Sequence, residues 1–183
     1  SVVKKIADRP GEAAASLEKT ISHLADTIKE CKQISASLRP EIIDDMGLLA
    51  TIDWHTRQFS EHYSHIRVVR QIDVDEPEVP EPLKIVIYRV FQEALNNAAM
   101  HSKADTIFIR LKRTGHDLEA EVEDNGRGFD FKEVSERVDR MSGYGLKSMR
   151  ERVEIIGGSF LLHSLPGTGT RVRISFHVSG DDL

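Results

Sequence analysis

The chain has 183 residues, of which 39% are hydrophobic and 30% charged, and its formal net charge is −5. This composition is typical of a soluble globular protein, and no dense basic patch occurs along it, so we expect no nucleic-acid partner. No apolar stretch is long enough to span a bilayer, no signal peptide is recognisable, and the single cysteine, Cys31, excludes an internal disulfide. We therefore expect a cytoplasmic segment without membrane contact.

Residues 1–40 are predicted to be helical, with a turn at Pro10-Gly11. From Ala14 to Leu38 the apolar residues advance in steps of three and four alternately, which is the spacing of a heptad repeat. A lone helix cannot bury such a stripe, so the seam indicates a partner helix. The alternative is an ordinary amphipathic helix that lies on the main domain.

Residues 41–47, between Pro40 and Gly47, are expected to be a connector, and residues 48–183 a mixed domain. Trp54 is expected in the core of that domain. The predicted helices cover residues 47–64, 83–101 and 146–156. The predicted strands cover residues 66–72, 106–112, 118–123, 159–163 and 170–178. This pattern predicts an α+β fold in which helices cover one face of a largely antiparallel sheet.

Two strands carry a polar residue at the end of an apolar row. Residues 118–123 alternate between apolar and acidic side chains, and Asp124 falls on the apolar face. A buried carboxylate needs a donor that the chain does not obviously supply. The alternative is a common Asp-Asn-Gly turn ending at Gly126. Thr170 likewise extends the apolar row of strand 170–178, where a capped hairpin turn is the alternative.

The helix at 83–101 carries a polar line along the rim of its apolar face, in which Glu93, Asn97 and His101 are spaced four apart. An acid, an amide and an imidazole suit an oxygen-ligated cation beside a phosphate group, and a solvated stripe is the alternative. In a fourth motif Gly143 and Gly145 precede a helix, where backbone amides can approach an anionic ligand.

Together these motifs resemble the ATP-binding domain of sensor histidine kinases, within the wider class that includes gyrase, the Hsp90 chaperones and MutL. Residues 92–101 (QEALNNAAMH) look like the N box, 124–129 (DNGRGF) the G1 box, 143–146 (GYGL) the G2 box and 167–170 (GTGT) the last glycine box. Residues 37–52 resemble the connector of NarL/DesK-type kinases. The heptad helix resembles the second helix of their dimerisation and phosphotransfer bundle.

The resemblance implies a two-layer, Bergerat-type ATPase fold behind a helical-bundle segment, with ATP and Mg²⁺ as ligands. Asp124 is expected to accept a hydrogen bond from the adenine amino group, with Thr170 assisting. Asn97 is expected to ligate Mg²⁺, and Glu93 to orient or deprotonate a water or to support the metal. The other nucleotide contacts it implies are His101, Lys103, Gly126, Gly128, Gly143, Tyr144, Gly145 and Leu146, under a lid formed by residues 131–142.

The resemblance further implies an ATP-dependent protein histidine kinase of a two-component system. It would act as a homodimer through the bundle and relay the γ-phosphoryl group, through a histidine, to the aspartate of a NarL/LuxR-type response regulator with helix-turn-helix output. It leaves open whether the parent protein is anchored in the inner membrane. An anti-sigma serine kinase with the same pocket, and a non-catalytic nucleotide-gated interaction module, are the alternatives.

Two positions depart from the family pattern. The family's acceptor histidine, followed by an acidic residue, lies on the first bundle helix, and no such pair precedes Pro10. His23 is a poor substitute because it falls on the expected second helix, so we expect the acceptor to lie upstream of this chain. Met100 stands where related chains often carry Lys before the histidine.

Overall fold

The computed structural model describes residues 20–21, 41–130 and 144–179. The chain divides into two units, residues 1–39 and 40–183. Of the first unit only Thr20 and Ile21 are described, and both are helical and exposed. The heptad seam and His23 therefore lie outside the described residues, so the expected bundle stays a prediction. Among the helices that are described, none is long and apolar enough to cross a membrane.

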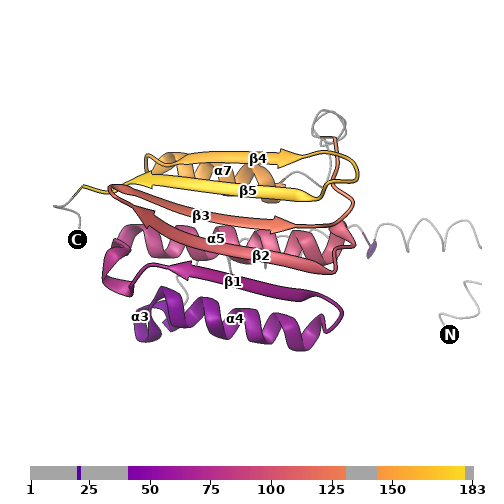
Figure 1. Ribbon diagram of the computed structural model, residues 1–183, viewed down its shortest axis with the longest axis horizontal. Coiled ribbons are helices and arrows are strands. Elements are labelled where there is room, and N and C mark those ends of the chain that lie inside the picture. Colours follow the sequence, from indigo (N-terminus) through magenta and orange to yellow (C-terminus); the bar gives the residue numbers. More distant parts are fainter. Residues whose placement is uncertain (1–19, 22–40, 131–143, 180–183) are drawn as a thin grey trace, which may run out of the picture. The chain divides into compact units, whose positions relative to one another are not determined.

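The second unit is a five-stranded sheet with helices on one side. Its described elements are α3 (Glu41–Met46), α4 (Leu48–His62), β1 (Arg67–Asp73), η1 (Glu76–Glu78), α5 (Glu81–Asn97), η2 (Ala98–Ser102), β2 (Thr106–Thr114), β3 (Asp117–Asp124), α7 (Tyr144–Ile155), β4 (Ser159–Ser164) and β5 (Thr170–His177). The strand order is β1-β2-β3-β5-β4, and only the β1–β2 pairing is parallel. Helices α5 and α7 lie behind the strands and α4 runs beside β1 (Figure 1). The predicted α+β architecture is confirmed.

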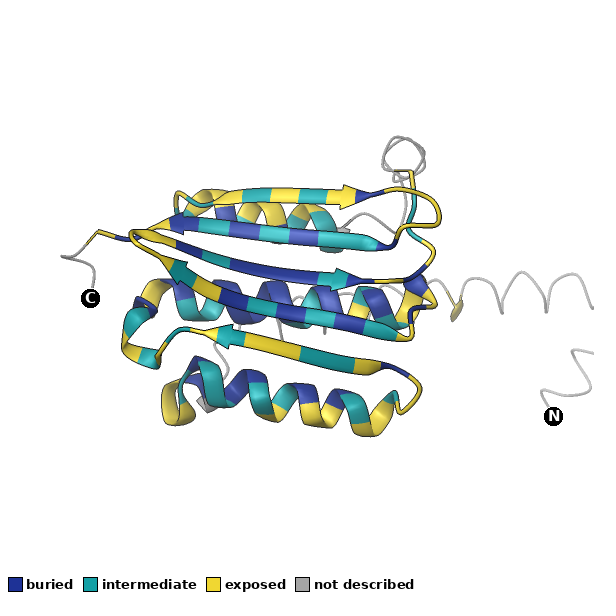
Figure 2. Cartoon of the chain, in the orientation of Figure 1, coloured by how far each residue is buried: buried dark blue, intermediate teal, exposed yellow. Residues whose placement is uncertain are grey.

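The core lies between the sheet and its helices because apolar side chains recur at every second strand position. Figure 2 shows this alternation of burial along the central strands. The buried strand residues are Ile107, Ile109, Leu111, Leu118, Ala120, Val122, Val172, Ile174 and Phe176. Helix α5 and the start of η2 meet them with a stripe spaced three and four apart, which consists of Ile87, Val90, Phe91, Ala94, Leu95 and Ala98.

The C-terminal end of α5 differs from the expected continuous helix over 83–101. The α-helix ends at Asn97 and continues as one π-helical turn, Ala98–Ser102. The Ser102 hydroxyl donates to the Ala98 carbonyl oxygen at 2.6 Å, and Lys103 then takes the left-handed conformation with φ of 56°. A short polar side chain that bonds the backbone of the preceding turn competes with regular helix, which accounts for the irregular end.

The expected connector, residues 41–47, packs on the domain: α3 is helical and Ile43 is only 3% exposed. The carboxylate of Glu76 then caps α4, because it accepts the backbone amides of Leu48 at 2.7 Å and Leu49 at 2.8 Å. Lys84 pairs with the same carboxylate at 3.0 Å.

Trp54 was expected in the core, and that expectation was wrong because its side chain is 45% exposed. The buried face of α4 is set by Ile52, Thr56 and Phe59, which are spaced four and three apart. Trp54 follows Ile52 by two positions, and two residues turn a helix by about 200°, so its side chain points away from that face.

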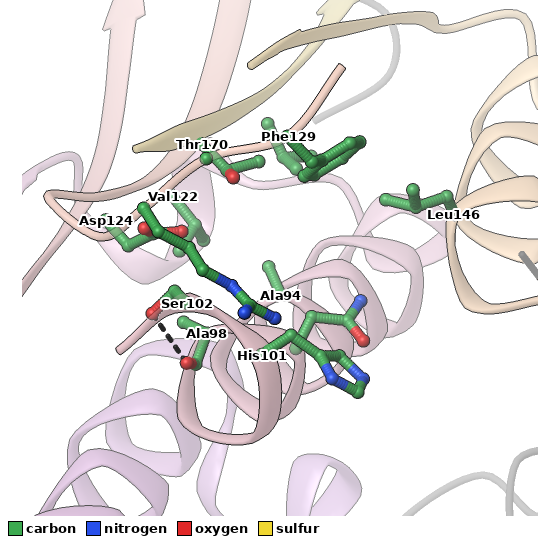
Figure 3. Close-up of a pocket in the computed structure, with 13 residues that line it drawn as sticks. Ala94, Ala98, His101, Ser102, Val122, Asp124, Phe129, Leu146 and Thr170 are labelled. Atoms are coloured by element: carbon green, nitrogen blue, oxygen red, sulfur yellow. Dashed lines mark hydrogen bonds between the residues drawn. The ribbon is translucent and has the colours of Figure 1, made fainter. Parts of the chain in front are cut away.

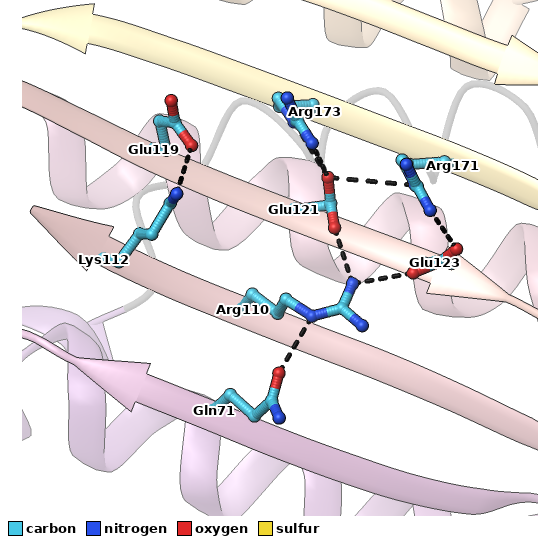
Figure 4. Close-up of polar contacts among 8 residues, drawn as sticks. All are labelled: Gln71, Arg110, Lys112, Glu119, Glu121, Glu123, Arg171 and Arg173. Atoms are coloured by element: carbon cyan, nitrogen blue, oxygen red, sulfur yellow. Dashed lines mark hydrogen bonds and ion pairs between the residues drawn. The ribbon is translucent and has the colours of Figure 1, made fainter.

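The face of the sheet that carries the acidic row of β3 is occupied by an ion-pair network (Figure 4). The guanidinium of Arg110 on β2 donates to Glu121 at 2.6 Å and to Glu123 at 2.7 Å. From β5, Arg173 donates to Glu121 at 2.8 Å and Arg171 donates to Glu123. The network fixes the register of β2, β3 and β5, because each carboxylate is paired from both neighbouring strands.

Replacing Glu121 by Ala is expected to lower the free energy of unfolding by about 2 kcal/mol, since Arg110, Arg171 and Arg173 all lose their contact with this carboxylate. The matched change is Glu119→Ala on the same strand and face. Within the described part of the chain Glu119 pairs only with Lys112, at 3.0 Å, and its side chain is 33% exposed against 10% for Glu121. We expect that control to cost below about 1 kcal/mol. Urea unfolding of both variants measures the difference, and equal losses would contradict a cooperative network.

Candidate functional site

A cavity of about 190 Å³ opens between α5, the loop after β3, the start of β5 and the start of α7 (Figure 3). Its lining residues are Ala94, Asn97, Ala98, His101, Ser102, Val122, Asp124, Arg127, Gly128, Phe129, Leu146, Thr170 and Val172. The apolar members come from both layers of the domain, and the polar members stand where strands and helices end. The cavity therefore offers an apolar slot that also carries polar groups.

Asp124 is 6% exposed and lies on the buried row of β3, as the alternation predicts. It pairs directly with Thr170 across the β3–β5 ladder. The Gly126 amide donates to Asp124 Oδ1 at 2.8 Å. Burial raises the pKa of Asp124 above its ordinary value, while that amide and Thr170 act in the opposite direction. Among the described residues no salt bridge to Asp124 is found, and its partners are Gly126 and Thr170.

The polar line of α5 reaches the same cavity in part. Asn97 and His101 line it, whereas Lys103 does not. Glu93 lies outside the lining, but its carboxylate touches the backbone at Gly145, where a methyl group would overlap Glu93 Oε1. Glu93 therefore stands at the junction of α5 and α7, beside the cavity rather than in it.

The loop after β3 is held on two sides. The Arg127 amide donates to the Ser102 carbonyl oxygen at 2.7 Å, and the Arg127 carbonyl accepts from the Gly167 amide at 2.6 Å. A methyl group on Gly126 would overlap the same Ser102 oxygen, so only glycine allows this approach. The side chain of Arg127 is exposed at the cavity, and among the described residues it has no ion-pair partner.

Of the residues predicted from the sequence, the structure brings together Asn97, His101, Asp124, Gly128, Leu146 and Thr170 around the cavity, while Gly126 is buried within the loop after β3. Gly143, the side chain of Tyr144 and the lid at 131–142 lie outside the description. The lining residues that the sequence reading missed are Ala94, Ala98, Ser102, Val122, Arg127, Phe129 and Val172. Val122 and Val172 could have been found, since each stands two positions from a predicted polar residue on the same strand face.

Gly169 and Gly157 form a matched pair with φ of 79° and 77°. A methyl group on Gly169 would overlap the Asp124 carbonyl oxygen, whereas nothing lies within 4 Å of one on Gly157. Gly157→Ala is expected to cost roughly 1–2 kcal/mol of stability from backbone strain alone. Gly169→Ala is expected to cost about 3 kcal/mol or more and to open the β3–β5 pairing at the cavity. Thermal unfolding distinguishes them, and equal costs would contradict the tight packing.

The described residues hold no group of three or more His, Cys, Asp or Glu side chains placed to bind a metal ion.

Comparison with known proteins assigns the domain. A family model described as "Histidine kinase-, DNA gyrase B-, and HSP90-like ATPase" matches residues 83–180, more than half of the chain. The chain is 29% identical over 175 residues to an uncharacterized sensor-like histidine kinase of Chloroflexus aurantiacus, covering 94% of this chain and 29% of that protein. It is 28% identical over 171 residues to the signal transduction histidine-protein kinase/phosphatase DegS of Brevibacillus brevis, covering 93% and 43%.

The chain thus spans less than half the length of these curated relatives. The solved histidine kinase domain of the Erythrobacter litoralis EL346 blue-light activated histidine kinase matches with a TM-score of 0.60 and 24% identity, over 74% of this chain and 63% of that one, a likeness of fold. The matched family region contains α5, the loop after β3 and the strand that carries Thr170, which are the elements that build the cavity. The chain belongs to the histidine kinase-, DNA gyrase B- and HSP90-like ATPase family, whose members use ATP, and its relatives within that family are sensor histidine kinases.

Proposed function

We propose that the chain is the catalytic part of a two-component sensor histidine kinase. It binds ATP with Mg²⁺ in the cavity and transfers the γ-phosphoryl group to a histidine on an upstream helix, for relay to an aspartate of a response regulator with helix-turn-helix output. The observation that carries the proposal is the convergence of a buried carboxylate, Asp124, and a polar helix edge, Asn97 and His101, on one apolar slot.

Adenine suits the part of this slot beside Asp124. A buried carboxylate that lacks a cationic partner favours a ligand with an N–H donor, and the exocyclic amino group of adenine supplies one. Val122, Val172 and Ala98 give the apolar walls on which a flat ring packs. Thr170 offers a hydroxyl beside the carboxylate, which gives the base a second polar contact.

The phosphates then lie toward α5 and the loop after β3. Arg127 alone among the described lining residues carries a permanent positive charge, and a guanidinium binds phosphate oxygens in a bidentate manner. The amide oxygen of Asn97 suits Mg²⁺, which accepts one or two protein oxygens and fills its remaining positions with water and phosphate oxygens. When bound, Mg²⁺ neutralises charge on the phosphates.

In the transfer step the bond between the γ-phosphorus and the β,γ-bridging oxygen breaks, a bond to the acceptor imidazole nitrogen forms, and ADP leaves. We assign to Glu93 the acceptance of the proton that the imidazole loses, because its carboxylate lies beside the cavity, at the junction of α5 and α7. Such a reaction depends on positioning and charge neutralisation, which a rigid slot with fixed polar groups provides.

The test uses a chain extended upstream of Ser1 through the helix expected to carry the acceptor. It is incubated with Mg²⁺ and γ-labelled ATP, and acid-labile, alkali-stable phosphate on the protein is counted. Label that appears on the wild-type protein and is lost in Asn97→Ala establishes a histidine kinase. If nucleotide binds and no label appears, the chain is the nucleotide-gated interaction module instead.

A further inference from the structure

Three polar side chains stand in register across three strands beside the cavity, and two of them, Asp124 and Thr170, line it. Asp124 on β3 pairs with Thr170 on β5, and Thr170 pairs with Ser164 at the end of β4. Asp124 and Ser164 are 6% and 8% exposed. Buried polar groups are normally hydrogen-bonded. The hydrogen bonds along this row therefore decide whether each hydroxyl offers a ligand its proton or its lone pairs.

The hydroxyl of Ser164 has three partners. Its Oγ accepts the Phe129 amide at 2.9 Å, donates to the Gly169 carbonyl at 3.0 Å and lies 3.1 Å from Thr170 Oγ1. A serine hydroxyl has one proton and two acceptor positions. The Gly169 carbonyl can only accept, so it takes the Ser164 proton, and the Phe129 amide fills one acceptor position.

The remaining acceptor position of Ser164 faces Thr170, so the Thr170 hydroxyl donates its single proton there. Thr170 also interacts with the Asp124 carboxylate, which competes for the same proton. With the proton turned to Ser164, the Thr170 oxygen presents lone pairs toward the cavity. Asp124 and Thr170 then form a pair of acceptors.

We infer that Ser164 is a positioning residue that fixes the polarity of the Thr170 hydroxyl and so makes the base-recognising end of the cavity select an amino group over a carbonyl group. The inference rests on the proposed nucleotide binding. A base with an amino group at this position fills both acceptors with N–H donors. A base with a carbonyl group there would place an acceptor against two acceptors, so that the carbonyl oxygen finds no donor in this pair.

ATP and inosine triphosphate test this, since inosine carries a carbonyl where adenosine carries the amino group. We expect Ser164→Ala to weaken ATP binding about tenfold, the worth of one net hydrogen bond, and to weaken inosine triphosphate binding far less. The ratio of ATP affinity to inosine triphosphate affinity, measured by calorimetry on each variant, is therefore expected to be lower in Ser164→Ala than in the wild type. Ser164→Thr keeps the hydroxyl and is expected to restore most of the preference.

The Thr170→Val background isolates the mechanism, because it removes the hydroxyl that Ser164 orients. There Ser164→Ala is expected to leave the preference unchanged. Equal weakening of both nucleotides by Ser164→Ala, or a lower melting temperature with the preference intact, would show a merely structural serine and overturn the inference. A wild-type domain that binds neither nucleotide overturns the proposed function, and this inference with it.

Discussion

Asp124→Asn is expected to weaken ATP binding about 100-fold, the loss that follows when a hydrogen bond to a buried charged group is removed. The asparagine side chain has the same shape, and its oxygen can still accept the Gly126 amide that now lies 2.8 Å from Asp124 Oδ1. The apo domain is therefore expected to be at least as stable as wild type. Calorimetric titration with ATP and thermal unfolding without it check the two halves of this result.

The pH dependence of stability follows from the direction in which the pKa of Asp124 is shifted. Burial raises the pKa of Asp124 in the folded state. Folding then favours the protonated carboxyl, so its contribution to stability falls as the pH rises from the ordinary aspartate value through the raised one. The advantage of the Asn variant in the apo state grows over the same window. ATP affinity of the wild type falls toward acid pH because protonation removes the negative charge of the acceptor.

Asp117→Asn is the matched control, since Asp117 stands at the far end of the same strand and contacts exposed His177 at 3.0 Å. It should leave ATP affinity unchanged. If Asp124→Asn bound ATP with wild-type affinity, the carboxylate would not recognise the base.

Asn97→Ala is expected to abolish the effect of Mg²⁺ on ATP binding. In the wild type, replacing Mg²⁺ by a chelator should weaken ATP binding about tenfold or more, because the phosphate charge is no longer neutralised. In the variant the affinities with and without Mg²⁺ should be alike, since the amide oxygen that ties the metal to α5 is gone. In the upstream-extended chain the variant should also lose phosphotransfer.

Asn96 provides the control for this prediction. It is the neighbouring residue on α5, of the same type, but it is exposed and does not line the cavity. Asn96→Ala should bind ATP with the full Mg²⁺ effect. Retention of that effect in Asn97→Ala would remove Asn97 from the proposed metal site.

The sequence predicted the sheet and half of the site because both depend on local periodicity. Alternation places Asp124 on the buried row without knowledge of any other strand, and the four-residue spacing from Asn97 to His101 places both on one helix edge. Ser164 could not be found in this way. Its importance depends on the register among β3, β5 and β4, which is set by long-range pairing.

Two further features depend on tertiary contacts that periodicity does not record. Glu121 lies on the solvent-facing row of β3, yet it is buried because arginines from both neighbouring strands cover it. The π-helical turn at Ala98–Ser102 has no composition signal, since its residues are ordinary helix formers until Ser102 bonds back to Ala98.

The pairing of β3 with β5 also shapes how the domain folds. The β2–β3 and β4–β5 hairpins close over short loops, whereas β3 and β5 are separated by α7 and β4, so their closure costs more chain entropy and is slower. Asp124 and Thr170 thus meet only when these distant segments have joined. A ligand held between them binds the complete native domain and no hairpin intermediate, and we expect saturating nucleotide to slow global unfolding rather than to speed folding.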